Sequence, residues 1–517
     1  EALAQLGPGE PEGLSAHAAL LAARCLLDRP DPVRALSFAL RAARPGGAAE
    51  TRIGALLLVG RIRTGLGQER LAAEAYRALL EVRPEHLEGR LLLGRMLVEL
   101  GWFGLALEAL APLPRPLPGW WRQVEGWAEA GRLRARAAAL GLLDRRGKGP
   151  NPRELPDLAR HLIRAGRMQG ARGVIAGLPP GGIRTWLEAW VAEGLAWPDP
   201  QPVPDLVLPP ETPPSLWLEA ALWLMQRGET ARAAASIAAV PDAALGKRGW
   251  LLRARLLVAQ GAHDRLDALA TAAESAGADR TLAAQIRLTA LTLGGALPTL
   301  DAGLLPAAAE ATDELPLVQY WDREMPPPDV AKVMDSWRAH HPKRRLLRFH
   351  RATARAWIEE AYGADAAAAF DACPHPAVEA DLLRYAVLGR EGGIWADADD
   401  SCKASWDGVL AAVPPAGQAV SFCDELLFYA YNAPLVARPG SPVLLRALRH
   451  AIRALLAPRK PGEFPIWFAT GPGLLTRQVA ADPRGVRLIG RALLRHLCLS
   501  EGSLAYKFDR EQDWRPD

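Results

Sequence analysis

The pattern of apolar and polar residues divides the chain into two parts of different texture. Up to about residue 298, apolar residues recur at helical spacing between short glycine or proline breaks, which predicts an all-α region. In the remainder, short β-like runs alternate with helical ones, which predicts an α/β region. We therefore expect a helical domain over 1–298, a linker over 299–312 and an α/β domain over 313–517.

The helical part contains an internal repeat. Residues 60–84 align with residues 94–118 at a constant offset of 34 residues. The matched pairs are Gly60 and Gly94, Gly67 and Gly101, Ala72 and Ala106, Ala75 and Ala109, and Pro84 and Pro118. This spacing resembles the tetratricopeptide repeat (TPR), in which a small residue lets two helices pack closely and a proline ends the second helix. Weaker copies are expected around glycines between helices, at Gly131, Gly166, Gly194, Gly228, Gly261 and Gly294.

A proline-rich stretch, residues 198–214, interrupts this TPR-like region and is predicted to be an extended connector. Two interpretations of the stacked helices remain open. They either form a solenoid that only supports the other domain, or they form a groove that holds an acceptor or partner chain.

Composition excludes several classes of protein. The 62 Lys and Arg residues against 58 Asp and Glu residues give a net charge of +4, too balanced for a dedicated nucleic-acid binder. The five cysteines show no C-x-x-C spacing, which favours a reducing cytoplasm over a disulfide framework or a zinc site. No apolar run reaches the roughly 18 residues of a transmembrane segment, so we expect a cytoplasmic protein, with a peripheral position at the inner face of the membrane as the alternative.

The α/β part begins with a β-α-β-α pattern. Strands are expected over 315–321 and 344–350, and helices over 327–340 and 352–363. A helix over 378–393 then leads into another strand. In open α/β sheets, ligands bind outside the carboxyl ends of the strands.

Acidic residues gather where this last strand should end. Ile394 and Trp395 enter the strand, and Asp397, Asp399 and Asp400 follow within a few residues. Crowded carboxylates repel one another, and Mg²⁺ or Mn²⁺ removes that repulsion while gaining oxygen ligands. Taken alone, a D-x-D motif is more typical of a solvated acidic turn than of a metal site.

The surrounding sequence, DLLRYAVLGREGGIWADADD over 381–400, resembles a family of sugar-nucleotide glycosyltransferases with a D-x-D motif. This family includes yeast-type initiating mannosyltransferases, bacterial capsule and lipopolysaccharide transferases, and clostridial glucosylating toxins. The segments LPLVQYW, AYNAPLVARPGSPVLLRALRHAI and ATGPGLLTR agree with it in order along the chain, and the resemblance covers about 313–517. The chain departs from the family in having Gln319-Tyr320-Trp321 where His-Gln-Ile-Trp is usual, and Trp395 where Tyr is commoner.

The resemblance implies a GT-A (Rossmann-like) fold, a retaining mechanism and a Mn²⁺ or Mg²⁺ cofactor. It implies that Asp399 ligates the metal directly and that Asp397 contacts the donor and holds the metal through water. Asp381 and Arg384 reach the sugar and the diphosphate, and Trp321 stacks on the base. The other residues that it places at the donor or metal site are Gln319, Tyr320, Tyr385, Asn432, Asp513 and Trp514. Asn432 also lies, with the pair Asp424 and Glu425, in the segment expected to face the acceptor.

The expected reaction moves a hexose, from a UDP-sugar in the first place, to a protein or peptide acceptor held by the TPR-like repeats. A metal would neutralise the departing phosphate, with Arg384 or Lys507 as an additional cation. Three alternatives remain: transfer to a capsule, lipopolysaccharide or lipid-linked glycan from a UDP-sugar or GDP-mannose; a catalytically inactive TPR adaptor; and a hydrolase or phosphotransferase. The last lacks a P-loop and a G-x-S-x-G motif.

Overall fold

The computed structural model describes residues 13–28, 31–113, 119–143, 154–199, 201–300, 305, 315–423, 429–458, 464–501 and 504–508. The chain forms two compact units that divide between Gly261 and Ala262, and Leu26–Asp31 groups with the second unit. The domain limits expected from the sequence, at 298 and 313, stay a prediction, and most of the expected linker lies outside the described residues.

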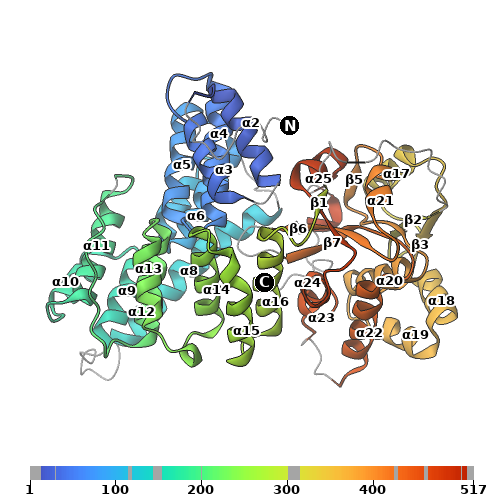
Figure 1. Cartoon of the computed structure of the whole chain (residues 1–517). Coiled ribbons are helices and arrows are strands. Elements are labelled where there is room, and N and C mark those ends of the chain that lie inside the picture. Colours follow the sequence, from blue (N-terminus) through green and yellow to red (C-terminus); the bar gives the residue numbers. More distant parts are fainter. Residues whose placement is uncertain are drawn as a thin grey trace. The chain divides into compact units, whose positions relative to one another are not determined.

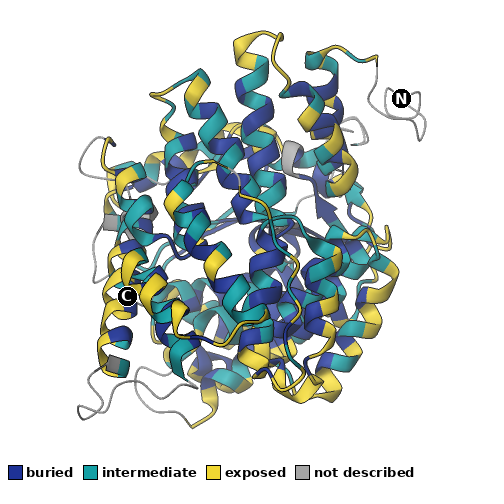
Figure 2. Cartoon of the chain, turned by 90° about the vertical axis from the view of Figure 1, so that its left-hand side faces the viewer, coloured by how far each residue is buried: buried dark blue, intermediate teal, exposed yellow. Residues whose placement is uncertain are grey.

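The first unit is helical among its described residues, as expected, and its helices are coloured blue to green in Figure 1. Buried residues lie on the helix sides that face neighbouring helices, and exposed residues lie on the opposite sides (Figure 2). The helices are α2 (Ala16–Asp28), α3 (Pro32–Ala42), α4 (Ala49–Gly65), α5 (Glu69–Val82), α6 (Leu87–Glu99), α7 (Phe103–Leu110), α8 (Gly119–Leu143), α9 (Leu155–Arg164), α10 (Met168–Ala176), α11 (Gly182–Ala196), α12 (Pro214–Gln226), α13 (Thr230–Ala238) and α14 (Gly246–Ala259).

Glycines explain why α4 packs on α5 and α6 on α7. A Cβ atom on Gly60 would lie 2.3 Å from the Tyr76 ring, and one on Gly94 would lie 2.7 Å from Leu110. Each helix pair therefore needs a glycine where its second helix presses against its first. The turns after α4 and α6 also match, because Gly67 and Gly101 have φ values of 73° and 76°.

Two of the six expected inter-helix glycines lie elsewhere. Gly131 is inside α8 and Gly194 is inside α11, so the prediction that they separate helices was wrong. They are sites of close approach instead, since a Cβ on Gly131 would lie 2.5 Å from the Phe103 ring and one on Gly194 would lie 2.8 Å from Met168. Residues 201–209 of the proline-rich stretch have no regular secondary structure.

The second unit contains the α/β sheet. Among the described residues, seven strands form one mixed sheet in the order β1-β8-β6-β7-β4-β2-β3, and β7 runs antiparallel to both of its neighbours. The strands are β1 (Thr299–Leu300), β2 (Leu317–Tyr320), β3 (Leu346–Phe349), β4 (Gly393–Ala396), β6 (Gln418–Cys423), β7 (Tyr429–Ala437) and β8 (Val486–Ile489). A small antiparallel ladder joins β5 (Asp400–Cys402) to β9 (Cys498–Ser500).

Helices cover both faces of this sheet. All four residues of β2 and of β4 are buried, because alternate side chains enter two separate cores. Val318 and Trp395 pack on one face with residues of α16, α18, α19, α20, α22 and α24, and Leu317 and Ile394 pack on the other with residues of α17, α21 and α25. The helices of this unit are α15 (Leu266–Ser275), α16 (Arg280–Leu293), α17 (Pro328–His340), α18 (Arg351–Tyr362), α19 (Ala364–Asp371), α20 (Pro376–Arg390), α21 (Asp407–Ala412), α22 (Pro442–Leu456), α23 (Ile466–Ala469), α24 (Pro472–Ala481) and α25 (Arg491–Leu497).

Helix α16 is part of this α/β core, although the sequence pattern groups it with the repeats. Leu288 and Leu297 belong to the same buried cluster as Leu474 and Leu488. Arg477 of α24 also donates a hydrogen bond to Thr281 at 2.6 Å. A fragment that began at residue 300 would lose these contacts.

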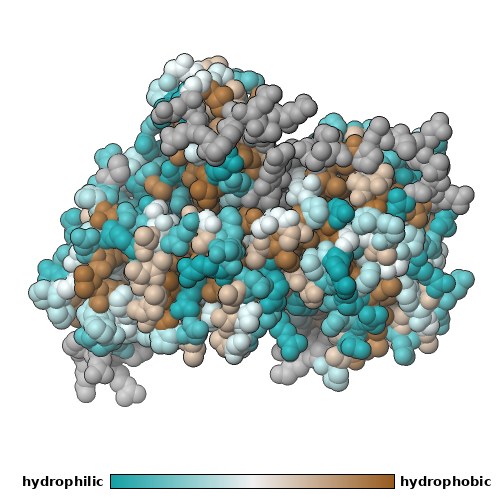
Figure 3. Space-filling model, in the orientation of Figure 1, coloured by the Kyte–Doolittle hydropathy of each residue, from teal (hydrophilic) through white to brown (hydrophobic). Residues whose placement is uncertain are grey.

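In the part of the chain that the structure describes, no helix combines the length and the apolar character needed to cross a bilayer. On the face drawn in Figure 3, hydrophobic residues form small patches between hydrophilic ones.

Candidate active site

Two glycines place the start of β4 between its neighbouring strands. Gly392 and Gly393 have φ values of 70° and 116°, which favour glycine over all other residues. A Cβ on Gly393 would lie 2.3 Å from the Pro316 carbonyl oxygen, and one on Gly392 would lie 2.9 Å from that of Ala437. The G-G pair therefore lets the backbone turn out of α20 and enter the sheet tightly, which fixes where β4 ends.

The acidic cluster lies where β4 ends, as the sequence predicts. Asp397 and Asp399 are partly exposed and Asp400 is buried, and one carboxylate oxygen of each lies within 4.8 Å of the other two. Three hard oxygen donors at this spacing fit Mg²⁺ or Mn²⁺ rather than a soft metal.

Asp397 is held in place by two donors. Its Oδ1 accepts hydrogen bonds from Nη2 of Arg384 and from Nε1 of Trp395, both at 2.7 Å. Arg384 is buried, donates a second bond to the Asn432 carbonyl at 2.6 Å, and lies 5.0 Å from the centre of the Trp395 ring. A buried arginine with three such constraints is preorganised, so Asp397 has one fixed orientation.

Asp381 joins three separated segments of the chain. It accepts hydrogen bonds from Nδ2 of Asn432 at 2.7 Å and from the hydroxyl of Thr470 at 3.0 Å. Thr470 is the first residue of the T-G-P-G turn, which agrees with the family pattern. Burial raises the pKa of Asp381 to about 6, against the lowering effect of Arg384. Burial therefore destabilises the ionised form of Asp381, and other interactions of the folded protein offset this free-energy cost.

This burial predicts a pH-dependent gain in the variant Asp381→Asn. Between the ordinary pKa of 3.8 and the raised value of about 6, the folded protein keeps a proton that the unfolded chain has released, so stability falls as the pH rises through this window. We expect the variant to raise the free energy of unfolding by about 1–3 kcal/mol at pH 8 and by less than half of that near pH 4.5. Urea denaturation at the two pH values measures this.

The matched control is Asp371→Asn, because Asp371 is a half-exposed carboxylate bonded to Arg355. It should show no gain at pH 8. An equal gain for Asp381→Asn at both pH values, or a loss at pH 8, would contradict the buried-carboxylate account.

Two carboxylates of the acidic cluster, Asp397 and Asp400, resist ionisation as well. Burial raises the pKa of Asp397, with Arg384 opposing it and the Asp399 charge adding to it. Burial and the charges of Asp399 and Asp397 raise the pKa of Asp400 well above its ordinary value. A cation in the cluster would relieve this repulsion.

Lys507 already supplies one positive charge. Its Nζ lies 2.5 Å from Oδ2 of Asp399 and donates a hydrogen bond to the Glu501 carbonyl at 2.6 Å. Lys507 thus lies at the cluster, where the sequence analysis expects an additional cation.

Trp321 lies beside the site on a small apolar cluster. Its neighbours there include Val330, Met334 and Leu504, and its ring meets the edge of Tyr506 at a centroid distance of 5.4 Å. The side chain is partly exposed, and its Nε1 has no hydrogen-bond partner among the described residues. Its expected role in base stacking stays a prediction.

Three other expected donor residues have their side chains in the interior. The amide of Gln319 donates to the Met334 carbonyl and accepts from Arg348. The hydroxyls of Tyr320 and Tyr385 bond to Glu379 and to the Thr470 carbonyl. Their direct binding of donor stays a prediction. Asp424, Glu425, Asp513 and Trp514 lie outside the described residues.

Two site residues carried no role in the sequence analysis. Trp395 appeared there only as a departure from the family pattern, and Thr470 only as part of a turn. The spacing does contain a signal for Trp395, because it precedes Asp397 by two residues on the same strand. Thr470 meets Asp381 only through the tertiary fold.

Residues 327–413, which include Arg384 and the whole acidic cluster, match a family described as "Glycosyltransferase sugar-binding region containing DXD motif". The protein is a transferase enzyme with a glycosyltransferase domain. No curated protein matches the chain. Among solved structures, PaToxG glycosyltransferase is similar, with 16% identity, a TM-score of 0.27, and coverage of 32% of this chain and 69% of that chain. A likeness this weak bears on neither fold nor mechanism.

Proposed function

We propose that the protein is a metal-dependent retaining glycosyltransferase with a GT-A fold. It moves a hexose from a nucleotide sugar, in the first place a UDP-sugar, to a protein or peptide acceptor. One observation carries the proposal: three carboxylates meet within 4.8 Å at the end of β4, beside a buried arginine, inside the region that matches the glycosyltransferase family.

Asp399 and Asp397 are the residues that would hold Mn²⁺ or Mg²⁺, since both are partly exposed. A bound divalent cation supplies Lewis-acid neutralisation of the charge that develops on the departing diphosphate. Asp513, which the family resemblance adds to this set, stays a prediction.

The chain's own residues bind and orient the donor. Arg384 orients Asp397 toward the donor sugar or ribose. The Lys507 ammonium lies 2.5 Å from Asp399, where it can also donate a hydrogen bond to a phosphate oxygen of the donor. Asp381 keeps Asn432 and Thr470 in register beside the same site. No side chain in the described part of this site is an activated nucleophile, which supports front-face attack by the acceptor and retention of configuration.

The acceptor side is proposed next to Asn432. Tyr431 is 45% exposed and stacks on Tyr429 at a centroid distance of 5.7 Å. Trp467 meets Tyr429 edge-on at 5.5 Å, and Gly473 of the T-G-P-G turn leaves room for the Trp467 ring, since a Cβ there would lie 2.6 Å away. This exposed aromatic surface favours a glycan acceptor as the second candidate, because sugar rings and aromatic faces pack well.

The helical unit is proposed to be a TPR-like array that holds the acceptor. The support is the equivalence of Gly60 with Gly94 and of Gly67 with Gly101, which have the same packing and turn roles at the same offset.

Cys402 and Cys498 are free thiols, which agrees with the proposed reducing cytoplasm.

The variant Trp321→Ala tests the proposed base contact. If the indole stacks on the base, the variant should weaken nucleoside diphosphate binding by about 1–3 kcal/mol and leave Mn²⁺ binding without nucleotide unchanged. Calorimetric titration measures both. The control is Trp357→Ala, a partly buried tryptophan on α18 that bonds Glu391. Equal nucleotide affinity in Trp321→Ala and wild type would contradict base stacking and leave Trp321 with a packing role alone.

The proposed function is tested by a donor screen on the full chain. Hydrolysis of UDP-glucose, UDP-galactose, UDP-N-acetylglucosamine and GDP-mannose is compared with Mn²⁺ and with EDTA. We expect hydrolysis of at least one UDP-sugar that EDTA abolishes. Hydrolysis that is insensitive to EDTA, or none with any donor, would contradict the proposal.

A further inference from the structure

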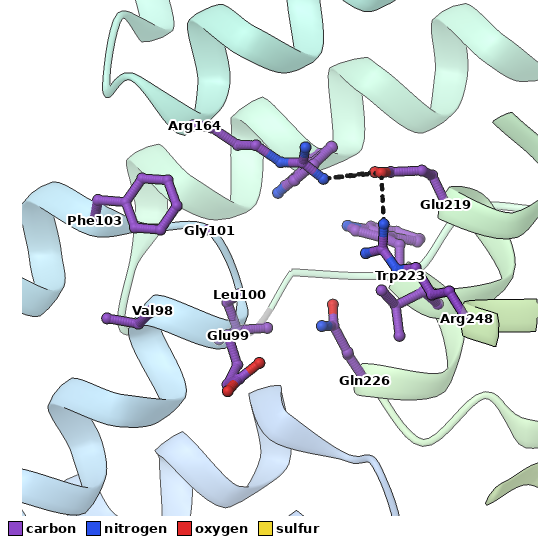
Figure 4. A pocket seen from close by; sticks show the side chains of 12 residues that line it. Val98, Glu99, Leu100, Gly101, Phe103, Arg164, Glu219, Trp223, Gln226 and Arg248 are labelled. Carbon is purple, nitrogen blue, oxygen red and sulfur yellow. Dashed lines mark hydrogen bonds and ion pairs between the residues drawn. The ribbon is translucent and has the colours of Figure 1, made fainter. Parts of the chain in front are cut away.

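A pocket with a mixed polar and apolar lining lies in the helical unit, far along the sequence from the acidic cluster. It has a volume of about 240 Å³ and forms where the turn after α6 meets α9, α11, α12 and α14. Its polar and aromatic lining includes Glu99, Arg164, Trp190, Glu219, Gln226 and Arg248 (Figure 4). We call it the Arg164–Arg248 pocket.

A largely buried carboxylate, Glu219, fixes the two arginines that give the pocket its name. Glu219 accepts from Nη2 of Arg164 at 2.7 and 3.0 Å and from Nη1 of Arg248 at 3.2 Å. Burial opposes the charged form of Glu219, but Arg164, Arg160 and Arg248 outweigh it and lower its pKa. One carboxylate thus contacts three arginines, of which Arg160 also pairs with Asp157.

The position of Arg164 leaves hydrogen-bond donors unused. Its guanidinium lies 5.6 Å from the Trp190 ring centre, and its stem packs where Gly101 has no side chain. Among the described residues, nothing accepts from its Nε or Nη1. Figure 4 shows Arg164 and Arg248 reaching Glu219 from two sides of the cavity.

Gln226 adds an unpartnered polar group. The residue is 7% exposed, its amide turns into the pocket (Figure 4), and no described residue makes a hydrogen bond to it. An amide that faces a pocket without a protein partner bonds to water or to a ligand there. It offers both a donor and an acceptor beside the arginines, which matches a peptide group next to a carboxylate.

The size of the pocket limits its ligand. Pockets for whole drug-sized molecules measure about 300–1,000 Å³, so a cavity of about 240 Å³ admits one side chain rather than a nucleotide sugar. Glu99 is exposed at the pocket and is the one lining carboxylate that no described arginine or lysine pairs with. The negative charge of Glu99 would repel a bound anion, so removal of that charge should strengthen anion binding.

We propose that the Arg164–Arg248 pocket binds the carboxylate of an acidic side chain on an extended polypeptide. That this polypeptide is the acceptor rests on the proposed function, whereas its binding to the pocket does not. Arg164 and Arg248 donate to the carboxylate, and Gln226 bonds the adjacent peptide group. The helical unit thus selects acidic sequences.

The test measures binding of fluorescein-labelled hexaglutamate and hexaglutamine peptides to the full-length protein by fluorescence anisotropy at 0.1 M salt. We expect hexaglutamate to bind more tightly than hexaglutamine by at least about tenfold. Arg248→Gln should weaken hexaglutamate binding about five- to tenfold, as for loss of a charge-assisted hydrogen bond that is partly exposed. Glu99→Gln should strengthen it. The control is Arg184→Gln, which removes an arginine paired with Glu188 elsewhere in this unit.

Circular dichroism melting confirms that each variant is folded. Equal affinity for the two peptides, an unchanged affinity in Arg248→Gln, or an equal loss in Arg184→Gln would overturn the pocket proposal. Metal-dependent donor hydrolysis by the wild-type chain is measured in parallel. Its absence alongside intact peptide selection would count against the proposed function and support the pocket, whereas preserved hydrolysis without peptide selection would overturn the pocket alone.

Discussion

Substitution of Asp399 by alanine should abolish glycosyl transfer and donor hydrolysis. Asp399 is partly exposed at the centre of the acidic cluster, and its carboxylate is the one that contacts Lys507. If it holds the metal, its loss removes several kcal/mol of charge stabilisation from the transition state, a decrease of about a thousandfold or more in rate. The stabilisation of the folded protein by Mn²⁺ with a nucleoside diphosphate should vanish with it.

Hydrolysis rates and thermal unfolding with and without Mn²⁺ and nucleotide provide the two readouts. The control is Asp371→Ala, which removes a surface carboxylate from the same unit. Because Asp399 and Lys507 are both partly exposed, the metal-free variant should unfold within a few degrees of wild type. Metal-dependent hydrolysis that survives in Asp399→Ala would remove Asp399 from the metal site.

Substitution of Arg384 by methionine should destabilise the protein strongly. Arg384 is 3% exposed, bonds Asp397 and the Asn432 carbonyl, and lies 3.7 Å from Asp381. Methionine fills similar space but leaves the two carboxylates without their buried counter-charge. Breaking a buried ion pair in this way costs about 3–5 kcal/mol, and urea denaturation at pH 8 should show a loss of this size.

The loss of unfolding free energy should be smaller at pH 5. Asp381, with a pKa of about 6, then carries a proton and is neutral, so it needs the positive charge of Arg384 less. The matched control is Arg446→Met, since Arg446 pairs with Asp482 on the partly exposed side of α22 and should cost no more than about 1 kcal/mol. A loss below about 1 kcal/mol in Arg384→Met would contradict the view that Arg384 organises the site.

Much of the architecture is predictable from local sequence pattern. Apolar periodicity and the glycine offset predict the helical part, and the alternation of strands and helices predicts the α/β part. Local pattern has no information on the direction of β7, because an antiparallel strand buried on both faces has the same apolar composition as a parallel one. It also groups α16 with the repeats, since an amphipathic helix does not reveal which neighbour its apolar side contacts.

Local sequence pattern likewise predicts one part of the site and not another. Asp397, Asp399 and Arg384 lie within one short segment, so their order along the chain already implies a cluster after β4. Gly131 and Gly194 show the opposite case, because a glycine within a helical pattern suits a turn and a close helix contact equally well. The contacts of Asp381 with Thr470 and of Asp399 with Lys507 join residues about 90 to 110 positions apart, and no local rule connects them.

The central claim is that the acidic cluster binds a nucleotide sugar through a divalent metal. Calorimetric titration of UDP into the full-length protein, first in EDTA and then with Mn²⁺, tests this most directly. We predict one binding site per chain that requires Mn²⁺ and that Asp399→Ala removes. Binding of UDP with the same affinity in EDTA, or binding that Asp399→Ala leaves intact, would contradict the account.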